Sequence, residues 1–307
     1  MNMKWIFGLL VLIVGLSACE GYQNNSNANK NDKVMIPGPV GSAYSDYIFP
    51  FFLQKPSKQI ELPKELKEIS GLSLHQSGNF LLANHDEKGI IFFLNPENGE
   101  IQKELDLKIK GDFEGIEMVD DIIYMVKSNG ELFSNKILEK EELEITPYET
   151  GLKKKADVEG LAYLEIRNML ILACKGKSGK KSEKNFYGFD IEAGSLLPLP
   201  LITVSEDDIK NFLAKYTKLQ EDETKKISKD FSPSGIAIHP ITGDWYILSS
   251  VGKLLFVLAP TGDILYIEKL DPNMYLQPEG IVFSKDGTQL YISSEAKDQT
   301  ASLFILK

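Results

Sequence analysis

The chain has 307 residues, of which 43% are hydrophobic and 25% are charged, and this composition excludes a mainly disordered or fibrous protein. Its 44 aspartates and glutamates outnumber its 34 lysines and arginines, which gives a formal net charge of −10. An acidic surface repels phosphate backbones, so this charge argues against a nucleic-acid partner and is compatible with cation binding.

Residues 1–18 have the layout of a bacterial lipoprotein signal peptide. One positive charge, Lys4, precedes an apolar run from Trp5 to Leu16 that is too short to span a bilayer comfortably. Ser-Ala-Cys follows, and this sequence resembles the lipobox at which Cys19 would be lipidated and become the mature N-terminus. We therefore expect export to the bacterial cell envelope, attachment to a membrane through lipid on Cys19, and a domain outside the cytoplasm. An ordinary signal peptide followed by a chance cysteine is the alternative.

Residues 19–45 are predicted to be a flexible, lipid-anchored tether. Residues 20–33 include five asparagines and no aliphatic side chain larger than alanine, and prolines and glycines follow. The folded domain is expected to span residues 46–307. The second cysteine, Cys174, ends an apolar run and is expected to be a buried small hydrophobic residue, so the two cysteines do not predict a disulfide framework.

Five glycines recur along the rest of the chain, each followed by a short aliphatic run. They are Gly71, Gly115, Gly160, Gly235 and Gly280, and successive glycines are 44, 45, 75 and 45 residues apart. A period near 45 residues is typical of a four-stranded propeller blade, and a glycine would let the backbone turn tightly into the inner strand. Each repeat also divides into short β-rich runs separated by Gly, Pro and Asp turns. We therefore predict an all-β protein, a five-bladed β-propeller with four-stranded blades.

The last repeat contains three predicted strands before the sequence ends. Residues 58–63 have the composition of the missing fourth strand, so we expect an N-terminal strand to close the last blade. The one long interval leaves a sixth, degenerate blade within residues 195–230 as an alternative. Residues 205–226 instead have a helical pattern, because Ser205 and Asp208 form a capping box and apolar residues follow at helical spacing. We therefore predict one helical insertion near residues 205–226.

A further regularity concerns the residues around each repeat glycine. In a propeller the residue before each inner strand lies at the mouth of the central channel, and the second strand ends on the same face. The residues immediately before the repeat glycines are Ser70, Glu114, Glu159, Ser234 and Glu279. The remaining positions that this reasoning places at the rim include Glu68, Asp86, Asp112, Asp157, Lys127, Lys175 and Glu295.

Three of these positions suggest a metal site. Glu114, Glu159 and Glu279 belong to separate blades, and carboxylates crowded around a narrow mouth repel one another at a cost that burial increases. A bound divalent cation removes that cost, and oxygen donors suit Ca²⁺ first and Mg²⁺ second over zinc. In the alternative, the glutamates are solvated turn residues, or Lys127 and Lys175 neutralise them without a metal.

The three histidines indicate little about function. His75 and His239 each lie four residues after a repeat glycine, so we expect them to be structural residues at the far end of the inner strands. His85 lies near the acidic rim, where a role as a ligand or base is less favoured than a structural one. The sequence contains no Gly-x-Ser-x-Gly elbow, phosphate-binding glycine loop or paired-cysteine motif.

Short motifs around the repeat glycines follow one another in a distinctive order. Asp-x-Glu-Gly-Ile/Leu occurs at 112–116 and 157–161, followed by Ser-Pro-Ser-Gly-Ile-Ala at 232–237, Gln-Pro-Glu-Gly-Ile-Val at 277–282 and Leu-Tyr-Ile-Ser-Ser-Glu at 290–295. This series resembles the SdiA-regulated family of bacterial exported proteins over residues 55–307. The resemblance implies a five-bladed propeller, similar to NHL-repeat propellers, with a calcium site. The family has no assigned biochemical activity that could be carried over to this chain.

Carried over by position, the resemblance implies calcium ligation by Glu114, Glu159 and Glu279, with Glu295 as a weaker candidate. Serines at the two other equivalent positions mean that a symmetrical ring of five carboxylates is not expected. Our first functional hypothesis is a calcium-binding recognition module that presents its rim to an unknown protein or small molecule. The alternative is a calcium-dependent hydrolase, lactonase-like or phosphoesterase-like, that uses the acidic channel mouth. A metal-free interaction domain is the third hypothesis.

Overall fold

The structure of the chain is a computed structural model that describes residues 35–36, 43–44, 47–138, 142–176, 179–180, 182–216, 219–296 and 299–307. The predicted signal peptide, Cys19 and most of the predicted tether lie outside the described residues. Two short strands within the expected tether, β1 (Met35–Ile36) and β2 (Ala43–Tyr44), pair with each other. None of the helices in the described part of the chain is both long enough and apolar enough to cross a membrane.

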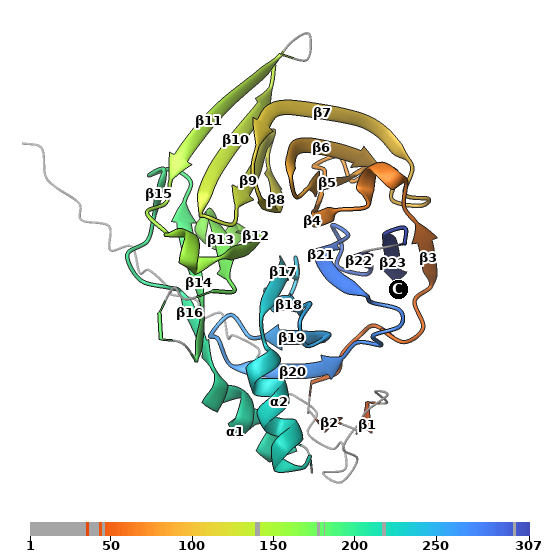
Figure 1. Ribbon diagram of the computed structural model, residues 1–307, viewed down its shortest axis with the longest axis vertical. Helices are drawn as coiled ribbons and strands as arrows, with labels where there is room; N and C mark the ends of the chain where they lie inside the picture. The colour runs from red at the N-terminus through yellow and green to blue at the C-terminus, as the bar shows by residue number, and fades with distance from the viewer. Residues whose placement is uncertain are drawn as a thin grey trace, which may run out of the picture. The chain divides into compact units, whose positions relative to one another are not determined.

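Five antiparallel sheets surround a central axis, which confirms the predicted five-bladed propeller (Figure 1). The first blade contains β4 (Ile69–Leu74), β5 (Leu81–His85), β6 (Lys88–Leu94) and β7 (Ile101–Lys110). The second contains β8 (Phe113–Val119), β9 (Ile122–Lys127), β10 (Glu131–Ile137) and β11 (Leu143–Glu149). The third contains β12 (Val158–Leu164), β13 (Met169–Cys174) and β14 (Glu183–Asp190), with two short outer strands, β15 (Ser195–Leu196) and β16 (Ile202–Ser205).

The fourth blade contains β17 (Pro233–Ile238), β18 (Trp245–Ser249), β19 (Leu254–Leu258) and β20 (Ile264–Lys269). The fifth contains β21 (Gln277–Phe283), β22 (Leu290–Glu295) and β23 (Ser302–Leu306), and β3 (Lys58–Glu61) is its outer strand. Three short 3₁₀ helices, η1 (Lys64–Leu66), η3 (Lys154–Ala156) and η4 (Glu165–Arg167), lie in the connections. In every blade the strand that begins at a repeat glycine motif is innermost.

The N-terminal strand closes the ring as predicted. β3 pairs with β23 in antiparallel register, with Ile60 opposite Leu303. The backbone N–H of Leu62 also donates to the carbonyl of Ala301 at 2.8 Å. The last blade is therefore completed by residues from the beginning of the domain, which covers an edge that would otherwise be exposed to unwanted strand pairing.

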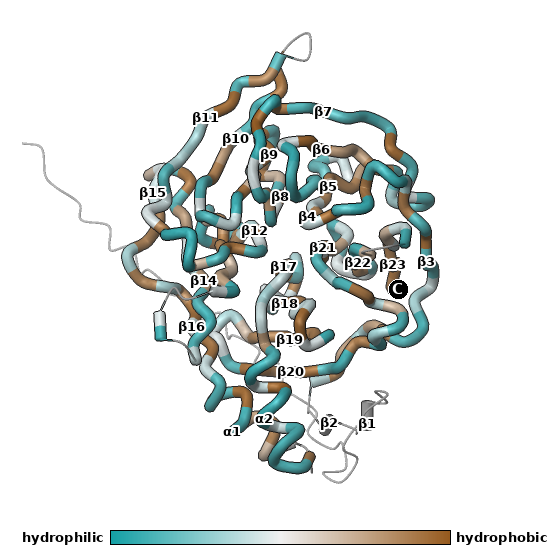
Figure 2. Tube along the Cα trace, viewed as in Figure 1, coloured by the Kyte–Doolittle hydropathy of each residue, from teal (hydrophilic) through white to brown (hydrophobic). Residues whose placement is uncertain are grey.

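The core is distributed over the contacts between blades. Each of five clusters of buried apolar residues contains side chains from two neighbouring blades, so every pair of adjacent sheets shares one cluster. Hydropathy alternates along the outer strand β7, whereas the middle strand β19 is hydrophobic throughout (Figure 2). This difference arises because a middle strand is covered on both faces and an outer strand has one face in water.

The helical insertion begins where the sequence predicts it, but it contains two helices instead of one. α1 (Glu206–Tyr216) and α2 (Glu221–Asp230) contact each other beside the fourth blade (Figure 1). The capping box is present, because Ser205 Oγ accepts from the N–H of Asp208 at 3.1 Å and Asp208 Oδ2 accepts from the N–H of Ser205 at 2.8 Å. Two shorter helices allow Ile209 and Ile227 to be buried in the same apolar cluster.

A short segment before β3 is also part of the folded domain. Phe49 stacks on Tyr266 of β20 with ring centroids 4.6 Å apart and planes inclined by 7°. The hydroxyls of Tyr47 and Tyr246 lie 2.7 Å apart, and Phe51 is buried between the fourth and fifth blades. These contacts begin within one residue of the predicted domain boundary at residue 46.

A candidate cation site at the channel mouth

The repeat glycines form the hub of the propeller. All five of them, together with the aliphatic residue that follows each one, line a cavity of about 10 Å³ on the axis. These aliphatic residues are Leu72, Ile116, Leu161, Ile236 and Ile281. A cavity of this size holds about one water molecule, so the hub is closed to anything much larger.

Close approach of the inner strands explains why the hub positions are glycine. A Cβ atom on Gly115 would lie 2.8 Å from the backbone nitrogen of Leu161 in the next blade. A Cβ atom on Gly235 would overlap the backbone oxygen of Glu279. None of the five repeat glycines has a positive φ. The expected tight turn is therefore not the reason for the repeat, which reflects instead the lack of space for any side chain at the axis.

The residues before the hub glycines converge at one mouth of the channel. Glu114 and Glu279 both line the hub cavity. The charge of Glu159 acts on both of them, and the charge of Glu279 acts on Glu114. The structure therefore brings together three glutamates from β8, β12 and β21, and we call this group the acidic ring.

Burial is the largest cause of a raised pKa at all three carboxyl groups in the acidic ring, and neighbouring negative charges add to it. Burial is the main cause for Glu279, whose pKa rises to about 8, and the charge of Glu159 adds to the effect. Burial also raises the pKa of Glu114, with further contributions from the charges of Glu159 and Asp112. The pKa of Glu159 is raised by burial although Lys175 opposes this. Near neutral pH, these groups retain protons more readily than ordinary glutamates do.

The two rim lysines have different partners. Lys175 Nζ lies 2.7 Å from Glu159 Oε1. Burial lowers the pKa of Lys175, but the charge and hydrogen bond of Glu159 together with the charges of Asp157 and Glu279 outweigh this, and the net change is upward. Lys127 instead lies 2.8 Å from Glu131 and 4.7 Å from the ring centroid of Phe133, both on its own blade. Lys175 therefore neutralises part of the acidic ring, whereas Lys127 is held by nearer partners.

Hydroxyl groups complete the ring of oxygen atoms. Ser70 Oγ donates to Glu114 Oε2 at 3.0 Å, and Ser250 hydrogen-bonds to Glu279. Ser234 Oγ donates to the carbonyl of Pro278 at 2.7 Å. In the first and fourth blades the ring position is thus a serine that bonds to the next blade.

Three of the other predicted rim residues surround the acidic ring. The charge of Asp112 acts on Glu114 and Glu159, that of Asp157 acts on Glu159, and that of Glu295 acts on Glu279. They therefore add negative charge around the ring, as the repeat positions predicted.

Glu68, Asp86 and His85 form a separate group on the first blade. His85 Nδ1 lies 3.0 Å from Asp86 Oδ1, and burial raises the pKa of Asp86, with a further contribution from the charge of Glu68. Lys67 Nζ lies 3.8 Å from Glu68 Oε1. The backbone carbonyl of Asp86 also accepts from the N–H of Phe113 at 2.6 Å, so this group is joined to the strand that carries Glu114.

The donor chemistry of the acidic ring suits a hard cation, but the side chains do not form a closed set of ligands as they lie. Over the described ranges, no group of three or more His, Cys, Asp or Glu side chains is arranged so that it could hold a metal ion. Glu159 is engaged by Lys175 and Glu114 by Ser70. Cation binding would therefore require these side chains to turn from their present partners toward the axis.

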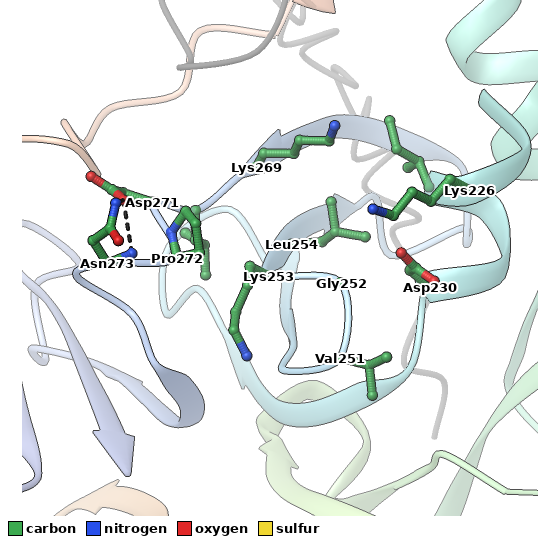
Figure 3. Close-up of a pocket in the computed structure, with 12 residues that line it drawn as sticks. Lys226, Asp230, Val251, Gly252, Lys253, Leu254, Lys269, Asp271, Pro272 and Asn273 are labelled. Atoms are coloured by element: carbon green, nitrogen blue, oxygen red, sulfur yellow. Dashed lines mark hydrogen bonds between the residues drawn. The ribbon is translucent and has the colours of Figure 1, made fainter. Parts of the chain in front are cut away.

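Pockets also lie away from the channel mouth, and the sequence did not predict them. One has a volume of about 590 Å³ and lies beside α2 and the turn after β18 (Figure 3). Lys226, Asp230, Lys253, Lys269 and Asp271 line it, so charges of both signs are present. Lys269 is also paired with Glu223 at 2.7 Å. These charges favour neither an anion nor a cation.

Another of these pockets lies at the opposite end of the inner strands and contains Glu117. One feature of the repeats distinguishes this position. At the position two residues after the hub glycine, Glu117 is the charged residue among Ser73, Ala162, Ala237 and Val282. His75 also lines this pocket and His239 packs on Phe283 with ring centroids 4.8 Å apart, which confirms that both histidines lie at the far end.

Comparison with solved structures supports the fold. The PQQ-bound aldose sugar dehydrogenase of Streptomyces coelicolor is 14% identical, with a TM-score of 0.52 over 82% of this chain and 97% of that chain. The glutaminyl cyclase of Myxococcus xanthus is 13% identical, with a TM-score of 0.52 over 82% of this chain and 95% of that chain. At these identities the likeness shows a shared fold alone.

Comparison with families is more specific. No curated protein matches the sequence. A sequence model of the SdiA-regulated family, however, matches residues 53–298, which include all five repeat glycines and the three glutamates of the acidic ring. The chain therefore belongs to the SdiA-regulated family.

Proposed function

We propose that this member of the SdiA-regulated family is a calcium-binding recognition domain, exported and attached to a membrane of the bacterial cell envelope through lipid on Cys19. The observation that carries the proposal is the acidic ring, in which one buried and two partly buried carboxyl groups converge from separate blades at the closed hub. Lys175 supplies one compensating positive charge. Among the described residues, Glu114 and Glu279 have no lysine of their own and hold protons more tightly than ordinary glutamates do, and a bound cation can replace these protons.

Calcium fits this environment better than the softer metals. Carboxylate and hydroxyl oxygens of Glu114, Glu159, Glu279 and Ser70 would be the protein donors, with Glu295 close enough to influence Glu279. Calcium accepts several oxygen ligands in flexible geometry, including water, so it tolerates an irregular ring. Bound calcium would supply positive charge that replaces protons on the ring.

The propeller rim is proposed to bind a protein or small molecule, with calcium fixing its shape. A calcium-dependent hydrolase is the second candidate, and the pair formed by His85 and Asp86 on the first blade favours it, because a carboxylate can orient a histidine base. Assays with ester and lactone substrates distinguish the two. Calcium-dependent turnover that is lost in His85→Ala would support the hydrolase, and calcium binding without turnover would support the recognition domain.

Calcium binding is tested by titration calorimetry and by thermal unfolding of the purified full chain in chelator or in millimolar calcium. A cation that binds the folded state stabilises it by about 2.7 kcal/mol at a concentration one hundred times its Kd. The combined substitution of Glu114, Glu159 and Glu279 by glutamine is expected to abolish the heat of binding and the shift in Tm. The matched control replaces Glu61, Glu100 and Glu104, three exposed glutamates, by glutamine and should retain both.

Two results would count against the calcium site. The absence of any calcium-dependent shift in the wild-type protein would remove it, and a full calcium response in the triple ring variant would place it elsewhere. Lipid attachment is tested separately by metabolic labelling with palmitate. Incorporation that is lost in Cys19→Ser is expected, and labelling that persists in this variant would contradict the anchor.

A further inference from the structure

A pocket of about 240 Å³ lies at the end of the inner strands opposite the acidic ring. We call it the far pocket, and the closed hub separates it from the ring. We propose that the far pocket binds a small amine with an apolar body, whose ammonium group pairs with the carboxylate of Glu117. This proposal concerns a second site and does not depend on calcium binding at the mouth.

Glu117 is held in place by three donors from three neighbouring inner strands. Its Oε1 accepts from Ser73 Oγ at 2.5 Å and from its neighbour, the N–H of Met118, at 2.9 Å. Its Oε2 accepts from the N–H of Tyr163 at 3.1 Å. A carboxylate has about four acceptor positions, so one position on Oε2 remains for a ligand. The side chain lines the pocket and retains partial exposure there.

Glu117 has no counter-charge within the described part of the chain. Burial raises its pKa to about 7, and the three hydrogen bonds oppose this, but no charged side chain contributes. Glu159 in the acidic ring differs, because Lys175 lies 2.7 Å from it. An ionised carboxylate in a recess without a cation of its own favours a cationic ligand.

The walls of the far pocket select a small and largely apolar molecule. Ala237, Val282 and Phe283 are buried apolar residues that line it. Drug-sized ligands usually occupy about 300–1,000 Å³, so this smaller volume suits a single ring or a short branched chain. An amine on such a body would place its charge on Glu117 and its carbon atoms against these walls.

The other titratable groups of the pocket leave the floor negative. Burial lowers the pKa of His75, and the charge of Lys285 lowers it further, so both favour the neutral form of this side chain. The hydroxyl of Tyr163 donates to Asn168 at 3.1 Å. Lys285 is exposed at the edge of the far pocket, where its ammonium group would pair with a carboxylate at the other end of a zwitterionic ligand.

The test uses three probes that differ in charge and share an aromatic ring: 2-phenylethylamine, 2-phenylethanol and 3-phenylpropionate. Binding to the full chain is measured at pH 8 by ligand-detected NMR. A hydrogen bond between charged groups contributes about 1.5–3 kcal/mol, so the wild-type protein should bind the amine at least about tenfold more tightly than the alcohol. Glu117→Gln should remove this preference, and the triple glutamine variant of the acidic ring should retain it.

A second variant covers the case in which Glu117→Gln fails to fold, since Glu117 also joins three blades. Ala237→Leu should fill the pocket without touching the carboxylate and should prevent binding of both the amine and the alcohol. Equal binding of amine and alcohol by the wild-type protein would overturn the proposal. So would a preference for the amine that persists in folded Glu117→Gln or Ala237→Leu protein. Loss of the preference in the ring variant would assign the amine to the channel mouth instead.

Discussion

Glutamine in place of Glu279 should make the protein more stable at high pH, although it removes a charged residue from a site with an adjacent lysine. Burial and the charge of Glu159 raise the pKa of Glu279 from 4.5 to about 8. The folded state therefore holds this proton more tightly than the unfolded state does. The corresponding stability is fully present below pH 4.5 and is lost as the pH rises through 8.

The size of this effect follows from the two pKa values of Glu279. Each pH unit between them corresponds to about 1.4 kcal/mol, so the interval from 4.5 to about 8 gives an upper value of roughly 5 kcal/mol. Glu279 is in partial contact with water at the channel mouth, which lowers the expected loss to about 2–5 kcal/mol. Glutamine does not titrate, so the variant should not show this loss.

The assay is urea unfolding of the wild-type and variant proteins at pH 5, 7 and 9 in the presence of chelator. The two proteins should have similar stability at pH 5, and the variant should be more stable by about 2–5 kcal/mol at pH 9. Glu104→Gln on the outer strand β7 serves as a control whose stability should follow that of the wild type at every pH. A difference between wild type and Glu279→Gln that is the same at pH 5 and pH 9 would refute the electrostatic reasoning.

Three further predictions concern the mouth, the hub and the closure of the ring. The calcium-induced rise in Tm should increase between pH 6 and pH 9, because protons compete with the cation for carboxyl groups of raised pKa, and thermal unfolding at both pH values measures it. Gly235→Ala should lower the free energy of unfolding by about 3 kcal/mol or more, since its Cβ has no space, whereas Gly151→Ala has open space and should cost only about 1–2 kcal/mol for its positive φ. Urea unfolding compares the two, and equal losses would contradict the packing argument. Deletion of residues 1–61 removes β3 and leaves β23 unpaired, so size-exclusion chromatography should show aggregation, while a chain that begins at residue 47 keeps this pairing and should not aggregate.

The fold was predictable because one physical constraint recurs in every blade. A side chain on Gly115 or Gly235 would collide with the backbone of the next blade, so the spacing of these glycines reports the spacing of inner strands. The helical insertion was predicted less well. Apolar residues at helical spacing up to Leu219 suggested a single helix, but periodicity alone does not reveal where a chain leaves one helix to begin another against the same cluster.

The convergence of the acidic ring was predictable for the same reason as the fold. Glu114, Glu159 and Glu279 occupy one repeat position, and a repeat position determines where a residue lies around the axis. The ion-pair partners of Lys127 and Lys175 were harder to predict from the sequence. The repeat does not show which of the carboxylates near each lysine the lysine will contact. Lys175 reaches Glu159, whereas Lys127 has a carboxylate four residues away and an aromatic ring beside it.

The far pocket was not predicted, because in the sequence Glu117 looks like an ordinary polar residue of a strand in which polar and apolar residues alternate. Its environment depends on donors from β4 and β12, which the ring closure brings beside β8. A comparison of equivalent positions across the five repeats identifies it, since only small or apolar residues occupy the others. Departures from a repeat are thus as informative as the repeat itself, because the shared positions build the scaffold and the exceptions carry the chemistry.

The hub determines how the two ends of the propeller can influence each other. Its cavity holds about one water molecule, so neither a cation bound at the mouth nor an amine bound in the far pocket could pass through it to the other end. The connection that remains is the inner strand β8, which carries Glu114 toward the mouth and Glu117 toward the far pocket. Both side chains hydrogen-bond to serines of β4, Glu114 to Ser70 and Glu117 to Ser73, so these two strands hold both sites at once. A cation that turns Glu114 away from Ser70 would therefore act first on the pair of strands that also positions Glu117.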